Sequence, residues 1–214
     1  MSLTLYFLRH GQTAMSRDDV LCGCGVDPDL TSEGAQMARE FGDAYRTFPF
    51  QAIFCSPLRR TRATALPISK LSGLVPEIRE DLKEIDYGKW EGLAREEVLQ
   101  KYHDDYLRWE ADPAWYPPTG GETAIVLAGR ALRVVEEIKG RFQKGPVLVV
   151  SHKATIRAVL CALFGIDVCR FRYRFDCPVG SLSVIEFGCH GPLMRTLADR
   201  SHLSKQMQML EGAQ

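Results

Sequence analysis

Two near-continuous apolar runs, each followed closely by a histidine, give the chain its clearest pattern. The first covers residues 3–8 and leads into Arg9 and His10, and the second covers residues 147–150 and leads into His152. An apolar run that ends in polar turn residues predicts a strand buried on both faces of a parallel sheet. Ligands of such sheets bind at the carboxyl ends of the strands. If the two strands are neighbours, both histidines face one site.

Helical spacing of apolar residues follows these runs and predicts an alternation of strands and helices. The stretches with this spacing are 34–45, which follows the N-cap residue Thr31, 125–138, and 156–164. This alternation is typical of an α/β fold with a mostly parallel sheet. From Phe171 to Leu197 the pattern turns to β, and the alternation over 182–187 predicts an antiparallel strand near the C-terminus.

A third apolar run, Ala52–Cys55, predicts another strand, and the helix expected after it begins with a cluster of arginines. Ser56 is a good N-cap, and the proline after it suits the first helical position. The arginines are Arg59, Arg60 and Arg62. Positive charge is unfavourable at a helix N-terminus unless an anion binds there. A solvated basic surface is the alternative, and it suits Arg59 and Arg62 better than Arg60.

Composition and charge exclude several classes of function. The 214 residues hold 27 Lys and Arg against 27 Asp and Glu, and this balance gives no support to a nucleic-acid or membrane-surface role. We find no apolar segment long enough to span a bilayer and no signal peptide. Seven scattered cysteines argue against a disulfide framework and for a cytoplasmic protein. Cys22 and Cys24 have no partner pair at metal-binding spacing, so no metal is expected.

Four motifs, in order along the chain, resemble those of the histidine phosphatase superfamily, which is also called phosphoglycerate-mutase-like. They are Arg9-His10-Gly11, residues 56–65, residues 82–92 and the stretch from Ser151 to Arg157. The resemblance covers residues 3 to about 187 and implies a three-layer α/β/α sandwich. It also implies that His10 is the nucleophile, that Glu84 is the general acid, and that His152 faces His10 across the pocket.

The resemblance further implies a phosphate-binding set that needs no metal or other cofactor. Its members are Arg9, Arg60, Gln12, Thr13 and Ser16. Ser16 stands where the family usually has an asparagine, and its hydroxyl can still donate one hydrogen bond. Arginine forks match phosphate oxygens bidentately, and cations supply most of what phosphoryl transfer requires. Lys153 replaces a glycine of the family pattern and adds a cation at the rim of the pocket.

The function implied is hydrolysis of a small phosphorylated metabolite through a phosphohistidine, in the phosphatase branch of the superfamily. A cofactor-dependent phosphoglycerate mutase is the alternative, but such mutases carry a longer insertion before the second histidine. They also differ in the residues that follow Arg-His-Gly. A phosphate-binding or scaffold domain without turnover is the alternative from another class.

The chain is expected to form a single domain over residues 1–214, and a homodimer is left open. Aromatic residues alternate with charges over 94–123, which predicts either packing of short helices or a lid above the sheet. Residues 14–30 are expected to be a loop, and residues 199–214 a partly ordered polar tail. Within the third motif, Asp86 and Glu91 are expected at turn or surface positions. His103, His190 and His202 match no motif and are expected on the surface.

Overall fold

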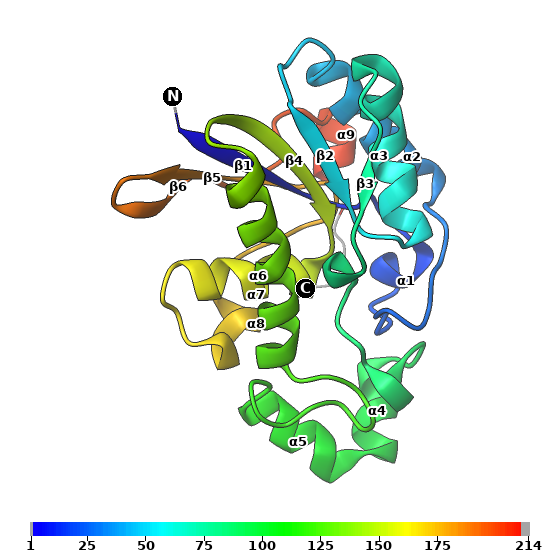
Figure 1. The fold of residues 1–214 in the computed structure, drawn as a ribbon. Coiled ribbons are helices and arrows are strands. Elements are labelled where there is room, and N and C mark those ends of the chain that lie inside the picture. The colour runs from blue at the N-terminus through cyan, green and yellow to red at the C-terminus, as the bar shows by residue number, and fades with distance from the viewer. Residues whose placement is uncertain (1, 211–214) are drawn as a thin grey trace.

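The computed structural model describes residues 2–210, which form an α/β fold around a six-stranded sheet (Figure 1). The strands are β1 Leu3–Arg9, β2 Ala52–Cys55, β3 Glu77–Ile78, β4 Gly145–Ser151, β5 Leu182–Gly188 and β6 Gly191–Asp199. Their order in the sheet is β3-β2-β4-β1-β5-β6. The first four of these are mutually parallel, whereas β5 is antiparallel to both β1 and β6. The predicted fold class, including the antiparallel strand near the C-terminus, is confirmed.

Helices cover both faces of the sheet and extend beyond its carboxyl edge. The α-helices are α1 Ala14–Arg17, α2 Ser32–Ala44, α3 Arg59–Ser72, α4 Arg95–Lys101, α5 His103–Ala111, α6 Ala124–Arg141, α7 Lys153–Leu163, α8 Phe171–Arg174 and α9 Lys205–Gln208. Short 3-10 helices occupy Glu80–Leu82, Gly88–Trp90 and Val168–Arg170. Helices α6 and α7 lie on one face, α2 and α3 on the other, and α4 and α5 lie beyond the strand ends (Figure 1). Among the described helices, none is long and apolar enough to cross a membrane.

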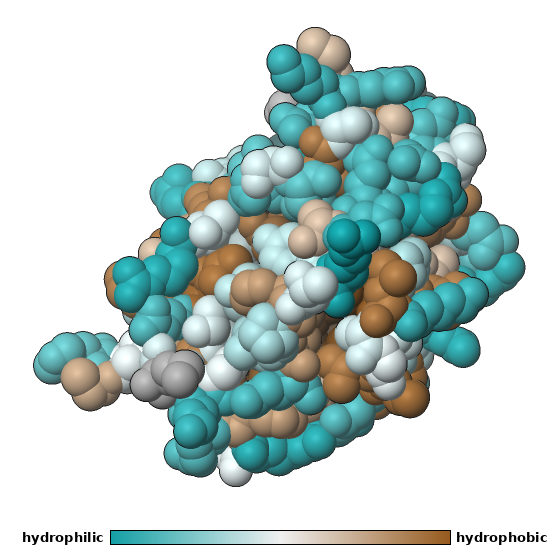
Figure 2. Space-filling model, turned by 90° about the horizontal axis from the view of Figure 1, so that it is seen from above, coloured by the Kyte–Doolittle hydropathy of each residue, from teal (hydrophilic) through white to brown (hydrophobic). Residues whose placement is uncertain are grey.

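Strand alternation explains why the central strands are apolar throughout. In β4, Val147 and Val149 join the core under α6 and α7, whereas Leu148 and Val150 join the core under α2 and α3. Successive side chains of a strand point to opposite faces. In a strand covered on both faces every central side chain is therefore buried, which favours apolar residues throughout. On the face drawn in Figure 2, hydrophilic and hydrophobic side chains are interspersed.

Three local expectations about secondary structure are wrong. Helix α3 begins at Arg59 with Leu58 as its N-cap, and the Ser56 side chain hydrogen bonds with His152 instead of capping the helix. Within the expected loop 14–30, Thr13 and Ser16 form a reciprocal capping box that starts α1. The stretch 171–181, expected to be β, holds α8 and a loop, and β structure resumes only at β5.

The expected C-terminal tail is ordered and packed over its described part. Strand β6 runs to Asp199, and Leu203 and Met207 are buried against α2. His202, expected on the surface, packs edge-on against the ring of Phe41, and burial lowers its pKa. These apolar contacts join residues far apart in the chain, so local polarity does not reveal them. Residues 211–214 of that expectation lie outside the described residues.

Candidate active site

The register of β1 and β4 brings the two motif histidines together. Arg9 pairs with Ser151 across the parallel strands, so His10 and His152 each follow at the same edge of the sheet. Their ring centroids are 5.2 Å apart, and the ring planes are inclined at 62°. Both side chains are almost completely buried. The structure therefore places the two predicted residues next to each other at one edge of the sheet, as expected for neighbouring strands.

Backbone contacts fix the His10 ring and its tautomer. His10 N donates to Ser151 O, and its carbonyl accepts from Gly180 N. The ring Nδ1 lies 2.8 Å from Gly11 O. A carbonyl can only accept, so Nδ1 carries the hydrogen and Nε2 keeps its lone pair. A Cβ on Gly11 would come within 2.4 Å of the Gly34 carbonyl oxygen, so this turn requires a glycine against the start of α2.

His152 is oriented by Ser56, which follows β2. The ring Nε2 lies 2.8 Å from Ser56 Oγ. Ser56 Oγ also accepts a long 3.4 Å hydrogen bond from Leu58 N, and the hydroxyl keeps both its own hydrogen and a second lone pair for Nε2. When the hydroxyl donates to Nε2, Nδ1 of His152 carries the ring hydrogen, and within residues 2–210 Nδ1 has no hydrogen-bond partner. One ring nitrogen of His152 is thus left for a ligand.

Two buried guanidinium groups supply positive charge beside the histidines. Arg60, on the first turn of α3, is fully buried and donates to Val26 O and Gly23 O at 2.9 and 2.8 Å. Arg9 donates to Cys177 O at 2.6 Å. The Nε atoms of both arginines have no hydrogen-bond partner in the described part of the chain. A buried arginine with an unused donor is costly unless an anion completes its hydrogen bonds.

Burial and these cations keep both histidines neutral. Burial lowers the pKa of His10 well below its usual value, and the charges of Arg60 and Arg9 lower it further. Burial is also the main cause of the lowered pKa of His152, with Arg60 and His10 adding to it. A neutral imidazole has a lone pair for nucleophilic attack, so the electrostatics suit that chemistry.

Glu84 lies at the N-terminus of α7 and is almost completely buried. Its carboxylate accepts hydrogen bonds from the backbone N–H groups of Ile85, Ala154 and Thr155 at 3.0 to 3.1 Å. Its side chain lines the same pocket as His10. Free N–H groups of a first helical turn attract a carboxylate, which explains how a residue outside any long element is held here.

The three remaining residues predicted to bind phosphate shape the turn after His10. Ser16 Oγ accepts from Thr13 N and donates to Thr13 O, while Thr13 Oγ1 accepts from Ser16 N. Gln12 Oε1 accepts from the Thr31 hydroxyl at 3.1 Å. Thr13 and Ser16 line the pocket, but the Ser16 hydroxyl hydrogen is already used. Direct phosphate contacts from these three residues stay predictions.

A larger cavity of about 450 Å³ opens beside the pocket that holds His10. The two share Leu21, Glu84, Tyr87, Arg95 and Lys153 as lining residues. One wall comes from the region predicted to be a lid or packed helices. There the Trp109 ring packs against Trp90, Tyr87 and Tyr106 with centroids 5.4 to 6.2 Å apart. Tyr106 and Trp109 therefore belong to a small core of their own beside the cavity, whereas Trp115 and Tyr116 of the same region are exposed.

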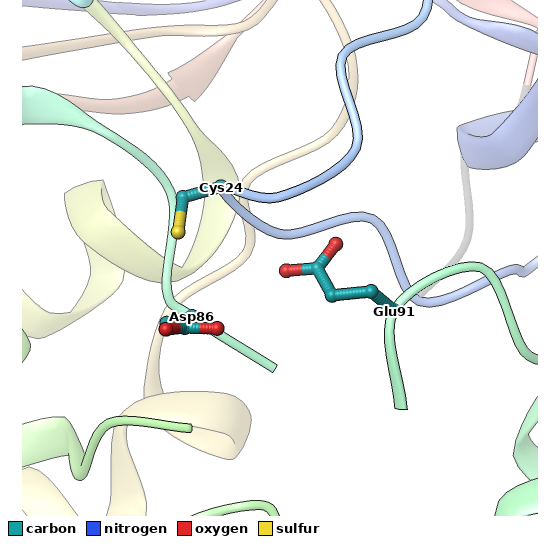
Figure 3. A group of neighbouring side chains, drawn as sticks. All are labelled: Cys24, Asp86 and Glu91. Atoms are coloured by element: carbon teal, nitrogen blue, oxygen red, sulfur yellow. The ribbon is translucent and has the colours of Figure 1, made fainter. Parts of the chain in front are cut away.

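Cys24, Asp86 and Glu91 gather near the cavity, and their side-chain ligand atoms lie within 4.8 Å of one another (Figure 3). Glu91 is not the surface residue that was expected. Its carboxylate accepts hydrogen bonds from the N–H groups of Gly23, Gly25 and Tyr87, and burial raises its pKa. Through these hydrogen bonds the Glu91 carboxylate links the loop of Gly23 and Gly25 to the segment around Tyr87.

Sequence reasoning missed several residues that complete the site. It treated Ser56 only as a helix cap, and it found no signal for the loop that supplies Cys177 O and Gly180 N. It also gave no role to Arg172, whose guanidinium lies 3.9 Å from the Trp109 ring centroid. The position of Ser56 at the end of a buried strand was the one available signal for any of these.

Comparison with known proteins connects this geometry to a family. Residues 5–200 match the family model described as histidine phosphatase superfamily, branch 1. Phosphoserine phosphatase 1 of Hydrogenobacter thermophilus is 38% identical over 161 residues, which are 75% of each chain. Glucosyl-3-phosphoglycerate phosphatase of Mycolicibacterium vanbaalenii is 31% identical over 171 residues, 77% of this chain and 75% of the relative. The solved structure of Bacillus stearothermophilus YhfR superposes with a TM-score of 0.86 at 27% identity and covers 95% of this chain and all of that one.

Proposed function

Because the chain belongs to the histidine phosphatase superfamily, branch 1, we propose that it hydrolyses its substrate through a phosphohistidine at His10. The protein is a metal-independent phosphomonoesterase that acts on small phosphorylated metabolites. The observation that carries the proposal is the pair of buried histidines beside two arginines with unused donors. This set provides one nucleophile and several donors for phosphate oxygens.

In the first step, Nε2 of His10 attacks phosphorus while the bond from phosphorus to the leaving oxygen breaks. The hydrogen bond from Nδ1 to Gly11 O holds the ring for this attack. Negative charge spreads over the three phosphate oxygens in the transition state. Arg9, Arg60 and the Nδ1–H group of His152 would stabilise that charge through the donors that the fold leaves unused.

Glu84 supplies the proton that the leaving oxygen requires, and in the second step it takes a proton from water. That water attacks phosphorus, the bond from phosphorus to His10 breaks, and inorganic phosphate leaves. The support for this role is the position of Glu84, which lines the pocket together with His10. Its hydrogen bonds to the start of α7 fix the carboxyl close to His152, which immediately precedes that helix.

Detection of the phosphoenzyme tests this function. Wild-type protein mixed with p-nitrophenyl phosphate, quenched in denaturant at neutral pH and weighed intact should carry one phosphoryl group. His10→Ala should carry none and should lose turnover, because no other described group replaces the nucleophile. His103→Ala, which changes an exposed histidine, is the matched control and should behave as wild type. Unchanged phosphorylation of the His10→Ala protein would contradict the assignment.

A further inference from the structure

The cavity beside the catalytic pocket is rich in positive charge. Its lining includes Arg95, Lys153, Arg157, Arg172 and Arg174, against only two carboxylates, Glu84 and Asp176. The Glu84 carboxylate is already hydrogen bonded to the start of α7. Cations gathered around a cavity focus an attractive potential for anions. The part of the substrate that lies outside the phosphate pocket therefore meets a cationic surface.

Two of these cations, Lys153 and Arg157, stand four residues apart on the first turns of α7. Side chains at this spacing lie on one helix face, and like charges there are destabilising. Arg9, from β1, adds a third positive charge to the same neighbourhood. Burial lowers the pKa of Lys153 to about 7, and Arg9 and Arg157 contribute to the shift. Three cations in one neighbourhood favour an anion beside them on electrostatic grounds.

Arg157 is the more deeply buried of the two residues. It is only 8% exposed, and within the described residues its Nε atom has no hydrogen-bond partner. Its Nη2 atom lies 3.8 Å from Asp176 Oδ1, which is too far for a hydrogen bond. The Asp176 side chain is 74% exposed. The guanidinium is thus buried with a weak, mostly solvated counter-ion and with a donor to spare.

We propose that Lys153 and Arg157 bind a second anionic group of the substrate, so that the enzyme selects phosphomonoesters that carry a carboxylate or a second phosphate. This inference rests on the proposed function, because it places the first phosphate beside His10. Lys153 lines both the catalytic pocket and the larger cavity, so it marks the junction between them. The second anion consequently lies a short distance from the scissile ester.

Matched substrates test the proposal. Glycerol 3-phosphate and 3-phosphoglycerate share a carbon skeleton but differ by a hydroxymethyl against a carboxylate, and 1,3-propanediol bisphosphate supplies a second phosphate. Each is measured as a substrate and as a competitor of p-nitrophenyl phosphate hydrolysis. Wild type should favour at least one of the two compounds with a second anion over glycerol 3-phosphate by about 10- to 100-fold. Which compound is favoured tells whether a carboxylate or a phosphate is recognised.

Variants assign the preference to the two residues. Lys153→Met and Arg157→Met should each remove most of it, whereas Lys153→Arg should retain it. Lys144→Met, which removes an exposed lysine, should leave it unchanged. No preference in wild type, or equal losses with all substrates in folded Lys153→Met, would overturn the proposal. Failure of the proposed function is distinguishable, since wild type would then form no phosphoenzyme with p-nitrophenyl phosphate.

Discussion

The catalytic pocket and the cavity beside it are built by different means. In the pocket, backbone groups after β1, at the end of β4, at the start of α7 and in the loop before β5 hold His10, Arg9 and Glu84, whereas His152 is held by a side chain, that of Ser56. In the cavity, side chains hold other side chains, as where Arg172 lies over Trp109. Backbone contacts persist when neighbouring side chains change, whereas side-chain contacts change with each substitution. We infer that the pocket fixes the reaction and that the cavity sets the choice of substrate.

After the complete loss expected for His10→Ala, the largest expected effect lies in the pocket, at Glu84. Glu84→Gln should slow phosphoenzyme formation with an alkyl phosphate by about 10²- to 10⁴-fold, because a poor leaving group needs a proton. The loss should be much smaller with p-nitrophenyl phosphate, whose phenolate leaves readily. Rapid quench must be used, since hydrolysis also needs Glu84. Equal losses in the rate of phosphoenzyme formation with both esters would mean that Glu84 has only a structural role.

His152→Ala should have the next largest effect. Loss of one donor to the developing charge should cut the rate of phosphoenzyme formation by about 10²- to 10³-fold while leaving His10 able to react. Ser56→Ala should reproduce a smaller part of this loss, because it removes only the group that orients the ring. Single-turnover rates measure both. A Ser56→Ala loss as large as that of His152→Ala would mean that the serine acts independently.

A substitution in the wall of the cavity should separate stability from chemistry. Trp109 is 2% exposed, and Trp109→Leu should lower the free energy of unfolding by about 2–4 kcal/mol in urea denaturation. Phosphoenzyme formation with p-nitrophenyl phosphate should stay within about threefold of wild type, since Tyr87, the pocket residue that Trp109 packs against, is not among the residues proposed to act on the phosphate. Trp115→Leu, at a 71% exposed position, is the control. A large loss in the rate of phosphoenzyme formation in Trp109→Leu would show that the catalytic pocket and the cavity are not independent.

The smallest expected effect is a pH dependence of substrate preference. Lys153 has a lowered pKa of about 7, so its charge is present below that pH and is lost above it. The charged groups that bear on it are Arg9 from β1, Arg157 from its own helix and Arg95 from α4, and the titratable thiol of Cys177 also faces it. Between about pH 6 and pH 8.5, any preference for 3-phosphoglycerate over glycerol 3-phosphate should fall several-fold. Lys153→Arg should abolish this change, and a flat wild-type ratio would argue against a titrating Lys153.

Local sequence predicted the sheet and both histidines, because a buried parallel strand must be apolar along its whole length. Such runs at residues 3–8 and 147–150 locate β1 and β4, and the first polar residues beyond them lie at the ligand-binding edge. The roles predicted for Glu84 and Arg60 came instead from resemblance of their motifs to the family. Nothing in the polarity of either residue indicates that it is buried.

Only the tertiary structure decided which polar residues are buried and what holds them. Glu91 and His202 look like surface residues in the sequence, yet one is tied to three backbone N–H groups and the other packs on Phe41. Ser56 looks like a helix cap but orients His152, across 96 positions of the chain. Apart from the bond between Glu91 and Tyr87, which are four positions apart, these contacts join segments distant in sequence. Their partners are determined by how the strands and helices pack, so the pattern of polar and apolar residues along the chain does not reveal them.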